Sequence, residues 1–306
     1  MSANRPLTAL LAVLAAVHAP FAGASPAAAA RTVTDDAGRT LTVRAAPLRI
    51  VSLSPGGAEM LFAAGAGAQL VGTVEYSDTP PAARRVARIG DAVAIDLERL
   101  VLLHPDVVVA WPGGGNPAQR EKIARLGIPV YDQQTPRLAQ LADSVRRLGV
   151  LAGTQAAAES TARSIEAQLA ALHREYGGSR ASGPQPSVLL EVWNRPIYTV
   201  GGRQLMSDAL TLCGVHNVFA DLSEPGPAVS LEAVIARDPD IIIAAGPPGE
   251  SAAWLDDWRR LGSLSAVRHG RLLAFEDQGL SRLGPSVLEA TAALCRALAN
   301  LNPGSY

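Results

Sequence analysis

The chain has 306 residues, is 48% hydrophobic, and carries a formal net charge of −1 with no long run of like charges. This balance excludes nucleic acid and anionic membrane surfaces as obvious partners, because both are bound through clustered Lys and Arg. The length exceeds the usual size of a single hydrophobic core, so we expect two domains.

Residues 1–30 have the pattern of a cleaved secretory signal peptide. Arg5 precedes the apolar run LTALLAVLAAVHAPFAG, and A-x-A cleavage sites follow at Ala22–Ala24 and Ala28–Ala30. The run is too short for a confident membrane span, and no cysteine near the cleavage site could carry a lipid. We therefore predict a free, monomeric periplasmic protein.

Residues 31–152 predict an α/β lobe. The strand RIVSLSP ends at Ser54, which should cap the helix GGAEMLFAAG. DVVVAW is an all-apolar strand typical of a buried parallel sheet, and the next helix begins with Asn116 as cap and Gln119 at the capping-box position. Short connections between alternating strands and helices predict a doubly wound, Rossmann-like sheet.

A long helix is predicted over residues 153–178, where apolar residues recur at helical spacing between two glycines. Residues 179–306 then repeat the strand and helix alternation, from SVLLEVW through DIIIAAG to RLLAF and the last helix. The fold class is therefore α/β, with two doubly wound lobes joined by a single long α-helix and a ligand cleft between the lobes.

An internal repeat supports this division. LERLVLLHPDVVVA (97–110) and LEAVIARDPDIIIA (231–244) match at a constant offset of 134. ARLGIPVYD (124–132) and RRLGSLSAV (259–267) match at an offset of 135, where we expect a helix to end before another strand. We interpret these segments as two copies of one αβ module, one in each lobe.

The cysteines and histidines do not predict a metal site. Cys213 and Cys295 are the only cysteines, and an even pair in an oxidising compartment favours a disulfide. The two lie 82 positions apart, and no histidine pair has metal-ligand spacing, so we expect no protein-held metal and no cofactor.

Scarce aromatic residues follow the predicted strands, at the sheet edge where such folds bind ligands. The aromatic candidates are Tyr76, Trp111, Trp193 and Tyr198. One of the loops after these strands also carries two residues of opposite charge, Asp277 and Arg282. Each also has an ordinary structural interpretation, as a loop anchor, a cap on its own sheet or a surface ion pair. Their convergence on one face favours a large, flat, mostly uncharged ligand.

Enzyme motifs do not support a catalytic function. GAGAQLVG follows a helix instead of opening one, so it is no dinucleotide fingerprint. WPGGGNPAQ lacks the P-loop Lys-Ser/Thr, although a weak phosphate site at this helix start stays open. The chain has no G-x-S-x-G elbow either.

The mature chain resembles the periplasmic cobalamin-binding proteins of the corrinoid ABC importer, within the class III two-lobed binding proteins that also carry haem and ferric siderophores. The resemblance rests on SLSPGGAEMLFAAG, YSDTPPAA, LERLVLLHPDVVVAWPGGGNPAQ, LGIPV, LCGVHNVF, PAVSLEAVIARDPDIII and SRLGPSVLEA, in that order. The segments YSD-x-PP and AW-x-GG are the most specific to the cobalamin branch.

The resemblance implies roles for individual residues. Gly56, Tyr76 and Trp111 would line the corrin-facing wall of the first lobe. Tyr198 or Trp193, with Asp277 and Arg282, would line the second. Cys213 and Cys295 would form the second-lobe disulfide, and Glu98 and Glu232 would dock onto arginines of a dimeric membrane permease. For the two glutamates, the ordinary alternative is a favourable contact with the helix macrodipole.

The sequence departs from the family where two tryptophans are expected, near Ala92 and at Gly226. The spacing from Asp277 to Arg282 is also one residue longer than expected. A different corrinoid, haem or a siderophore therefore stays open as the ligand.

Overall fold

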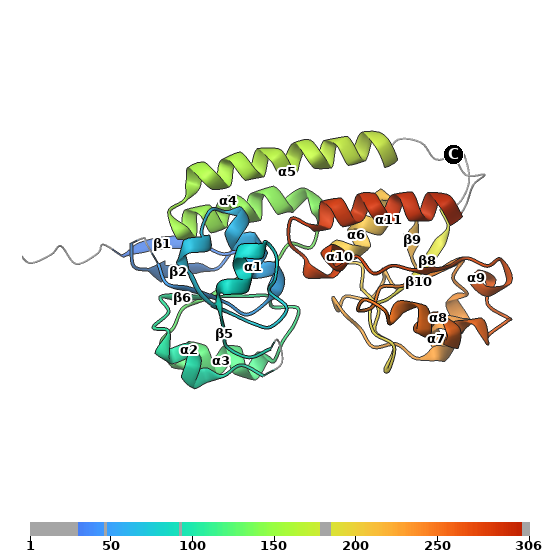
Figure 1. The fold of residues 1–306 in the computed structure, drawn as a ribbon, viewed down its shortest axis with the longest axis horizontal. Helices are drawn as coiled ribbons and strands as arrows, with labels where there is room; N and C mark the ends of the chain where they lie inside the picture. Colours follow the sequence, from blue (N-terminus) through green and yellow to red (C-terminus); the bar gives the residue numbers. More distant parts are fainter. Residues whose placement is uncertain (1–29, 46–47, 92–93, 178–184, 302–306) are drawn as a thin grey trace, which may run out of the picture.

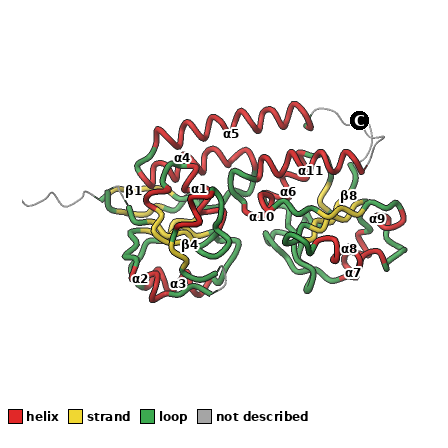
Figure 2. The backbone as a smooth tube through the Cα atoms, viewed as in Figure 1, coloured by secondary structure: helices red, strands yellow, loops and turns green. Residues whose placement is uncertain are grey.

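The computed structural model describes residues 30–45, 48–91, 94–177 and 185–301. Figure 1 shows two α/β lobes side by side beneath one long helix, and Figure 2 shows a sheet inside each lobe. A small antiparallel pair, β1 (Arg31–Thr34) and β2 (Thr40–Val43), borders the first lobe. The predicted fold class is confirmed by this arrangement.

The first lobe is built on a parallel sheet in the order β5-β4-β3-β6-β7. Its strands are β3 (Ile50–Ser52), β4 (Leu70–Thr73), β5 (Ala87–Arg88), β6 (Val107–Ala110) and β7 (Val130–Asp132). Its helices are α1 (Pro55–Ala63), α2 (Leu97–Leu102), α3 (Pro117–Arg125) and α4 (Leu141–Ala152), with short 3-10 turns η1 (Gly67–Gln69), η2 (Pro81–Arg85) and η3 (Leu138–Gln140).

The second lobe is built on a parallel sheet in the order β11-β10-β8-β9. Its strands are β8 (Ser187–Glu191), β9 (His216–Asn217), β10 (Ile241–Ala244) and β11 (Leu272–Ala274). Its helices are α6 (Leu205–Leu212), α7 (Leu231–Arg237), α8 (Ser251–Arg259), α9 (Ser265–Arg268), α10 (Gln278–Arg282) and α11 (Val287–Leu301).

The internal repeat corresponds to α2–β6 in one lobe and α7–β10 in the other. Both strands are buried along their whole length between parallel neighbours, which explains their all-apolar sequences. The repeated Pro-Asp pair also has a structural role. Asp106 accepts a hydrogen bond from the backbone N–H of Arg49, and Asp240 accepts one from Ser187. Each aspartate thus fixes the start of the neighbouring parallel strand.

Two local predictions need correction. Asn116 does cap α3 by accepting from Ala118 N–H, but Gln119 Oε1 accepts from Ile95 N–H at 3.1 Å instead of closing a capping box. The side chain thereby ties α3 to the preceding loop. In the second copy, residues 259–267 lead into the short helix α9, and the strand β11 begins only at Leu272.

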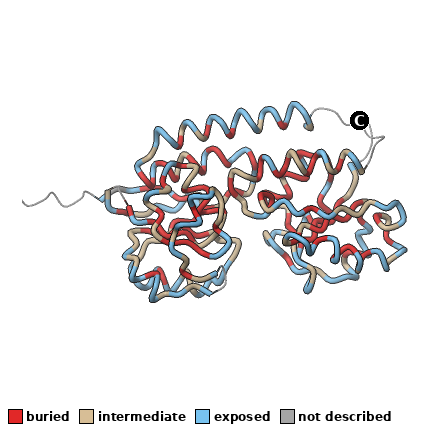
Figure 3. The backbone as a smooth tube through the Cα atoms, in the orientation of Figure 1, coloured by how far each residue is buried: buried red, intermediate tan, exposed pale blue. Residues whose placement is uncertain are grey.

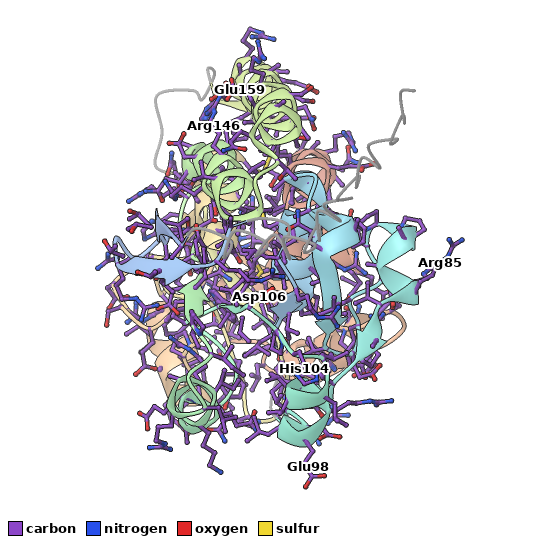
Figure 4. The ribbon with its side chains drawn as sticks, turned by 90° about the vertical axis from the view of Figure 1, so that its left-hand side faces the viewer. Arg85, Glu98, His104, Asp106, Arg146 and Glu159 are labelled. Atoms are coloured by element: carbon purple, nitrogen blue, oxygen red, sulfur yellow. A yellow bond between two sulfur atoms is a disulfide. The ribbon has the colours of Figure 1, made fainter. Side chains whose placement is uncertain are left out.

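The linking helix α5 (Gln155–Tyr176) lies along α4 of the first lobe and α11 of the second (Figure 1). Figure 4 shows Arg146 of α4 beside Glu159 of α5, and their side chains pair at 2.7 Å. Arg146 also pairs with Glu166 at 2.7 Å. These contacts fix the start of the long helix against the first lobe.

One hydrophobic core runs through both lobes beneath α5. It contains Ile50 and Leu61 from the first lobe and Leu190 and Leu294 from the second, whereas the opposite face of each sheet has a core of its own. Figure 3 shows the buried backbone continuing from one lobe into the other under the long helix. Wide separation of the lobes would expose this shared core to water, which is unfavourable.

We therefore predict that ligand binding closes the lobes only slightly. A hinge between lobes that share a core resists the wide bending that flexible strands allow. Small-angle scattering curves of the mature protein with and without ligand should nearly superimpose. A large domain rotation on binding would contradict this architecture.

The predicted disulfide is confirmed. Cys213, at the end of α6, is bonded to Cys295 of α11, with a Cα–Cα distance of 4.8 Å. Both residues are buried in the shared core. No helix among the described residues is long and apolar enough to cross a membrane.

Candidate functional site

A cavity of about 490 Å³ lies between the two lobes, where the carboxyl ends of the first-lobe strands face α10. Tyr76, Trp111 and Gly56 line it from the first lobe, and Arg282 and Leu283 line it from the second. Its size is within the range of small-molecule sites, and open α/β sheets bind ligands at this edge.

Tyr76 is held in the cavity wall by the loop that follows β4. The residue is 78% exposed, and its backbone has φ of 64°, a left-handed conformation that is uncommon for residues other than glycine. The next residue, Ser77, is buried and accepts a hydrogen bond from Thr73 Oγ1. Arg88 donates to the Ser77 carbonyl and pairs with Asp78 at 3.0 Å. A strained backbone held this firmly around an exposed ring is typical of a functional site.

Trp111 directly follows β6, and two glycines lie against its ring. A Cβ atom at Gly113 would come within 2.6 Å of the indole, and one at Gly114 within 2.3 Å, so neither position accepts a side chain without movement. The glycines therefore let the backbone wrap one side of the ring while the residue still lines the cavity.

Gly56 belongs to the seam between the lobes at this cavity. A Cβ atom there would lie 1.8 Å from the carbonyl oxygen of Arg282, so only glycine allows α1 to approach the end of α10 so closely. Beside it, Glu59 of α1 accepts hydrogen bonds from Ser286 N–H at 2.6 Å and from Ser286 Oγ at 2.9 Å. Burial raises the pKa of Glu59, while the Ser286 bonds and the charge of Arg282 oppose that shift.

The structure separates Asp277 and Arg282, the two charged candidates of the second lobe. Asp277 is exposed and caps α10 by accepting from Gly279 N–H at 2.9 Å, and it does not line the cavity. Asp277 is the N-cap of α10 and has an extended backbone, whereas Arg282 is the last residue of that helix, so the two side chains start from opposite ends of α10. Of the two, Arg282 lines the cavity, and contact of Asp277 with a ligand stays a prediction.

Trp193 and Tyr198 follow β8 and pair with each other across a tight turn. Trp193 is 50% exposed and lies edge-on to Trp254, with ring centroids 6.1 Å apart. Tyr198 is 38% exposed. Neither residue lines the cavity between the lobes, so their contact with a ligand stays a prediction.

Arg120 is a cavity residue that the sequence reasoning missed. It projects from α3, and its Nη2 pairs with Asp132 at 2.9 Å. Its Nε is buried and has no hydrogen-bond partner among the described residues. A basic residue on a predicted surface helix has no sequence signal that distinguishes it from a solvated one. The sequence reasoning also missed Glu59, although an acid inside an apolar helix is a signal that could have identified it.

Glu98 and Glu232 lie in the first turns of the equivalent helices α2 and α7. Figure 4 shows Glu98 pointing outward at the lower edge of the first lobe, and Figure 1 places α2 and α7 at that same edge of the molecule. Hydrogen bonds from its own backbone and from Ser230 lower the pKa of Glu232, which keeps it ionised. Each glutamate has exposed apolar neighbours on its helix: Val101 and Leu102 on α2, Leu231 and Ile235 on α7.

No cluster of three or more His, Cys, Asp or Glu side chains suited to a metal ion occurs in the part of the chain that the structure describes.

Comparisons with known proteins agree with this geometry. A family described as periplasmic binding protein matches residues 50–278. The vitamin B12-binding protein of Salmonella typhimurium strain LT2 is 35% identical over 258 residues, which cover 84% of this chain and 92% of that protein.

Two solved structures have the same fold. The periplasmic vitamin B12-binding protein BtuF of Vibrio cholerae is 30% identical with a TM-score of 0.72, covering 84% of this chain and 98% of its own. The periplasmic heme-binding protein RhuT from Roseiflexus sp. RS-1 is 25% identical with a TM-score of 0.68, covering 84% and 99%.

Proposed function

The chain belongs to the periplasmic binding protein family, and on that basis we propose that it captures cobalamin or a related corrinoid and delivers it to an ABC importer. Membership of this family implies that the protein acts in the periplasm and has a membrane permease as its partner. It is a family of binding proteins and not of enzymes.

The observation that carries this proposal is the placement of Tyr76 and Trp111 on one wall of the interlobe cavity. A large flat ligand can lie against these rings while the seam at Gly56 keeps the opposing lobe close. Arg282 adds a cationic group on the facing side. Vitamin B12-binding relatives match most of this chain, which favours a corrinoid over other flat ligands.

Haem is the second candidate. The solved haem-binding protein matches the same share of the chain as the solved vitamin B12-binding protein, although at lower identity. Gly226, where the family pattern has a tryptophan, is exposed, and a Cβ atom there would meet no atom within 4 Å. The second missing tryptophan maps near Ala92, outside the described residues.

Titration tests both candidates. Cyanocobalamin, cobinamide, haemin and a ferric siderophore are added separately to the purified mature protein while heat and absorbance are followed. The proposal requires one-to-one binding of a corrinoid that is recovered chemically unchanged. Binding of haemin alone would favour the second candidate, and turnover of any ligand would contradict a transport role.

We infer that Glu98 and Glu232 dock onto basic residues of the two halves of a permease dimer. Their equivalent positions in the repeat and their common edge of the molecule suit a partner with two matching sites. Exposed apolar residues beside both glutamates are also typical of a protein interface.

Reversing these charges should reduce uptake without affecting ligand binding. We expect Glu98→Lys or Glu232→Lys to weaken docking by about 1 kcal/mol each, since exposed ion pairs contribute little individually. The double variant should lose roughly the sum of both effects. The measurement is corrinoid uptake by cells that depend on this protein, with Glu175→Lys on α5, at the opposite edge of the molecule, as the control. Normal uptake by the double variant would exclude this docking mode.

Three further features belong to the same proposal. Residues 1–30 act as a signal peptide, of which residues 1–29 lie outside the described part of the chain. The domains divide into residues 31–152, 153–178 and 179–306. The mature protein acts as a monomer, as a carrier that must reach its permease freely.

A further inference from the structure

A second cavity, of about 500 Å³, lies wholly within the second lobe. Its walls are the turn after β8, the start of α7 and the end of α8, contributing Ile197, Leu231, Trp258 and Leu261. It shares no lining residue with the interlobe cavity. Whatever occupies it is therefore not the ligand held between the lobes.

A buried acid lines this second cavity. Glu191, the last residue of β8, is fully buried, and its Oε2 accepts a hydrogen bond from Trp258 Nε1 at 2.8 Å. Its Oε1 is buried without a hydrogen-bond partner among the described residues. Unsatisfied buried polar atoms are rare in native proteins because they lose hydration without compensation.

Arginines line the same cavity but do not neutralise Glu191. Arg195 pairs with Asp257 at 2.7 Å, and Arg260 pairs with the same carboxylate at 3.5 Å. Both arginines are more than three-quarters exposed along their side chains, so they lie toward the solvent. Among the described residues, no ion pair within 4 Å involves Glu191. The carboxylate of Glu191 therefore has no cationic partner among the described residues. The cavity around it is lined by the indole of Trp258 and by several aliphatic side chains.

We propose that this cavity binds a small flat organic cation, such as an aromatic amidinium, whose N–H group donates to Glu191 Oε1. The ring of such a ligand would lie against Trp258, Ile197 and Leu261, while its charge would compensate the buried acid. The cavity has the volume of an ordinary small-molecule site. The inference is independent of which ligand the interlobe cavity takes.

Binding should depend on pH because Glu191 must be ionised to hold a cation. Burial raises the pKa of Glu191 to about 7, opposed by the Trp258 hydrogen bond and reinforced by the charge of Asp257. Two other charged side chains of the cavity keep their charge over this range, because pairing with Asp257 raises the pKa of Arg195 and pairing with Arg195 lowers the pKa of Asp257. We therefore expect affinity for a permanent cation to be about tenfold higher at pH 8 than at pH 6, following the ionised fraction.

Calorimetric titration with benzamidine tests the proposal, with benzamide as the uncharged probe of the same shape. Benzamidine should bind one-to-one and more tightly than benzamide at pH 8, and saturating cyanocobalamin should leave its affinity unchanged. Glu191→Gln should weaken benzamidine binding at least tenfold and remove its pH dependence. The glutamine can still accept from Trp258, and its melting temperature at pH 8 reports whether the lobe remains folded.

Ile197→Trp is the second variant, because it fills the cavity and leaves residue 191 as glutamate. It should also weaken benzamidine binding at least tenfold. The proposal is overturned if benzamidine produces no heat above the buffer control at pH 8, or if it binds wild type and both variants equally. It is likewise overturned if benzamidine fails to bind while Ile197→Trp impairs uptake, since the cavity would then receive a side chain of the permease.

Discussion

Replacing Cys213 and Cys295 together by alanine should lower the free energy of unfolding by about 4 kcal/mol, the chain-entropy value for a loop of this length. The bond joins residues 82 positions apart and ties α6 to α11, so its loss frees most of the second lobe in the unfolded state. For a domain of this size the melting temperature should fall by roughly 10 °C, measured by calorimetry without reductant.

Reductant provides the control for this variant. Dithiothreitol should lower the melting temperature of the wild-type protein and leave that of the double alanine variant unchanged. Thiol titration of the unreduced, denatured wild type should find no free thiol. Two free thiols, or equal melting temperatures for wild type and variant, would contradict a stabilising bond.

Much of the fold could be predicted because its signals are local. The all-apolar strands β6 and β10 are buried in the middle of parallel sheets, and hydrophobicity alone indicates this. Ser54 and Asn116 cap the helices that follow them, as their residue types predict. The repeat was visible because both lobes use the same Pro-Asp pair to fix a neighbouring strand.

The site was less predictable because it depends on contacts distant in sequence. Glu59 meets Ser286 across 227 positions, and no local pattern indicates that pairing. Asp277 was predicted as a ligand contact from its place after a strand. Its carboxylate caps α10 by accepting from Gly279 N–H, and its contact with a ligand stays a prediction. A strand end therefore indicates the correct edge of the sheet, whereas the direction of each side chain depends on the helix that begins there.

The same reasoning explains why the second cavity was not predicted. In the sequence, Glu191 is a single acid at the end of an apolar strand. Only the fold brings Trp258 and the turn at Ile197 around it. Its sequence equivalent in the other lobe is not apparent from the repeat, which begins only at α2 and α7. A comparison of the two repeated segments finds only what they share, so it does not detect a residue such as Glu191 that occurs in one lobe alone.

Trp111→Ala should weaken corrinoid binding by about 1 to 3 kcal/mol, or roughly 5- to 150-fold in Kd. The indole lines the interlobe cavity and is braced by Gly113 and Gly114, so its removal takes away a preformed stacking surface. The melting temperature should change little, because the ring lies at the cavity and not in the buried core. Corrinoid binding should also quench tryptophan emission in the wild type, and this quenching should be smaller in the variant.

Two further variants show whether the ring itself is responsible. Trp111→Phe should recover part of the affinity, since it retains an aromatic face against the ligand. Leu126→Ala removes a large side chain, 54% exposed, from the same lobe outside the cavity, and should leave affinity unchanged. If Trp111→Ala instead lowers stability while affinity for every corrinoid, haemin and siderophore tested stays constant, the indole serves only to cap its sheet. Measuring affinity and melting temperature on the same preparations therefore separates a ligand surface from a structural one.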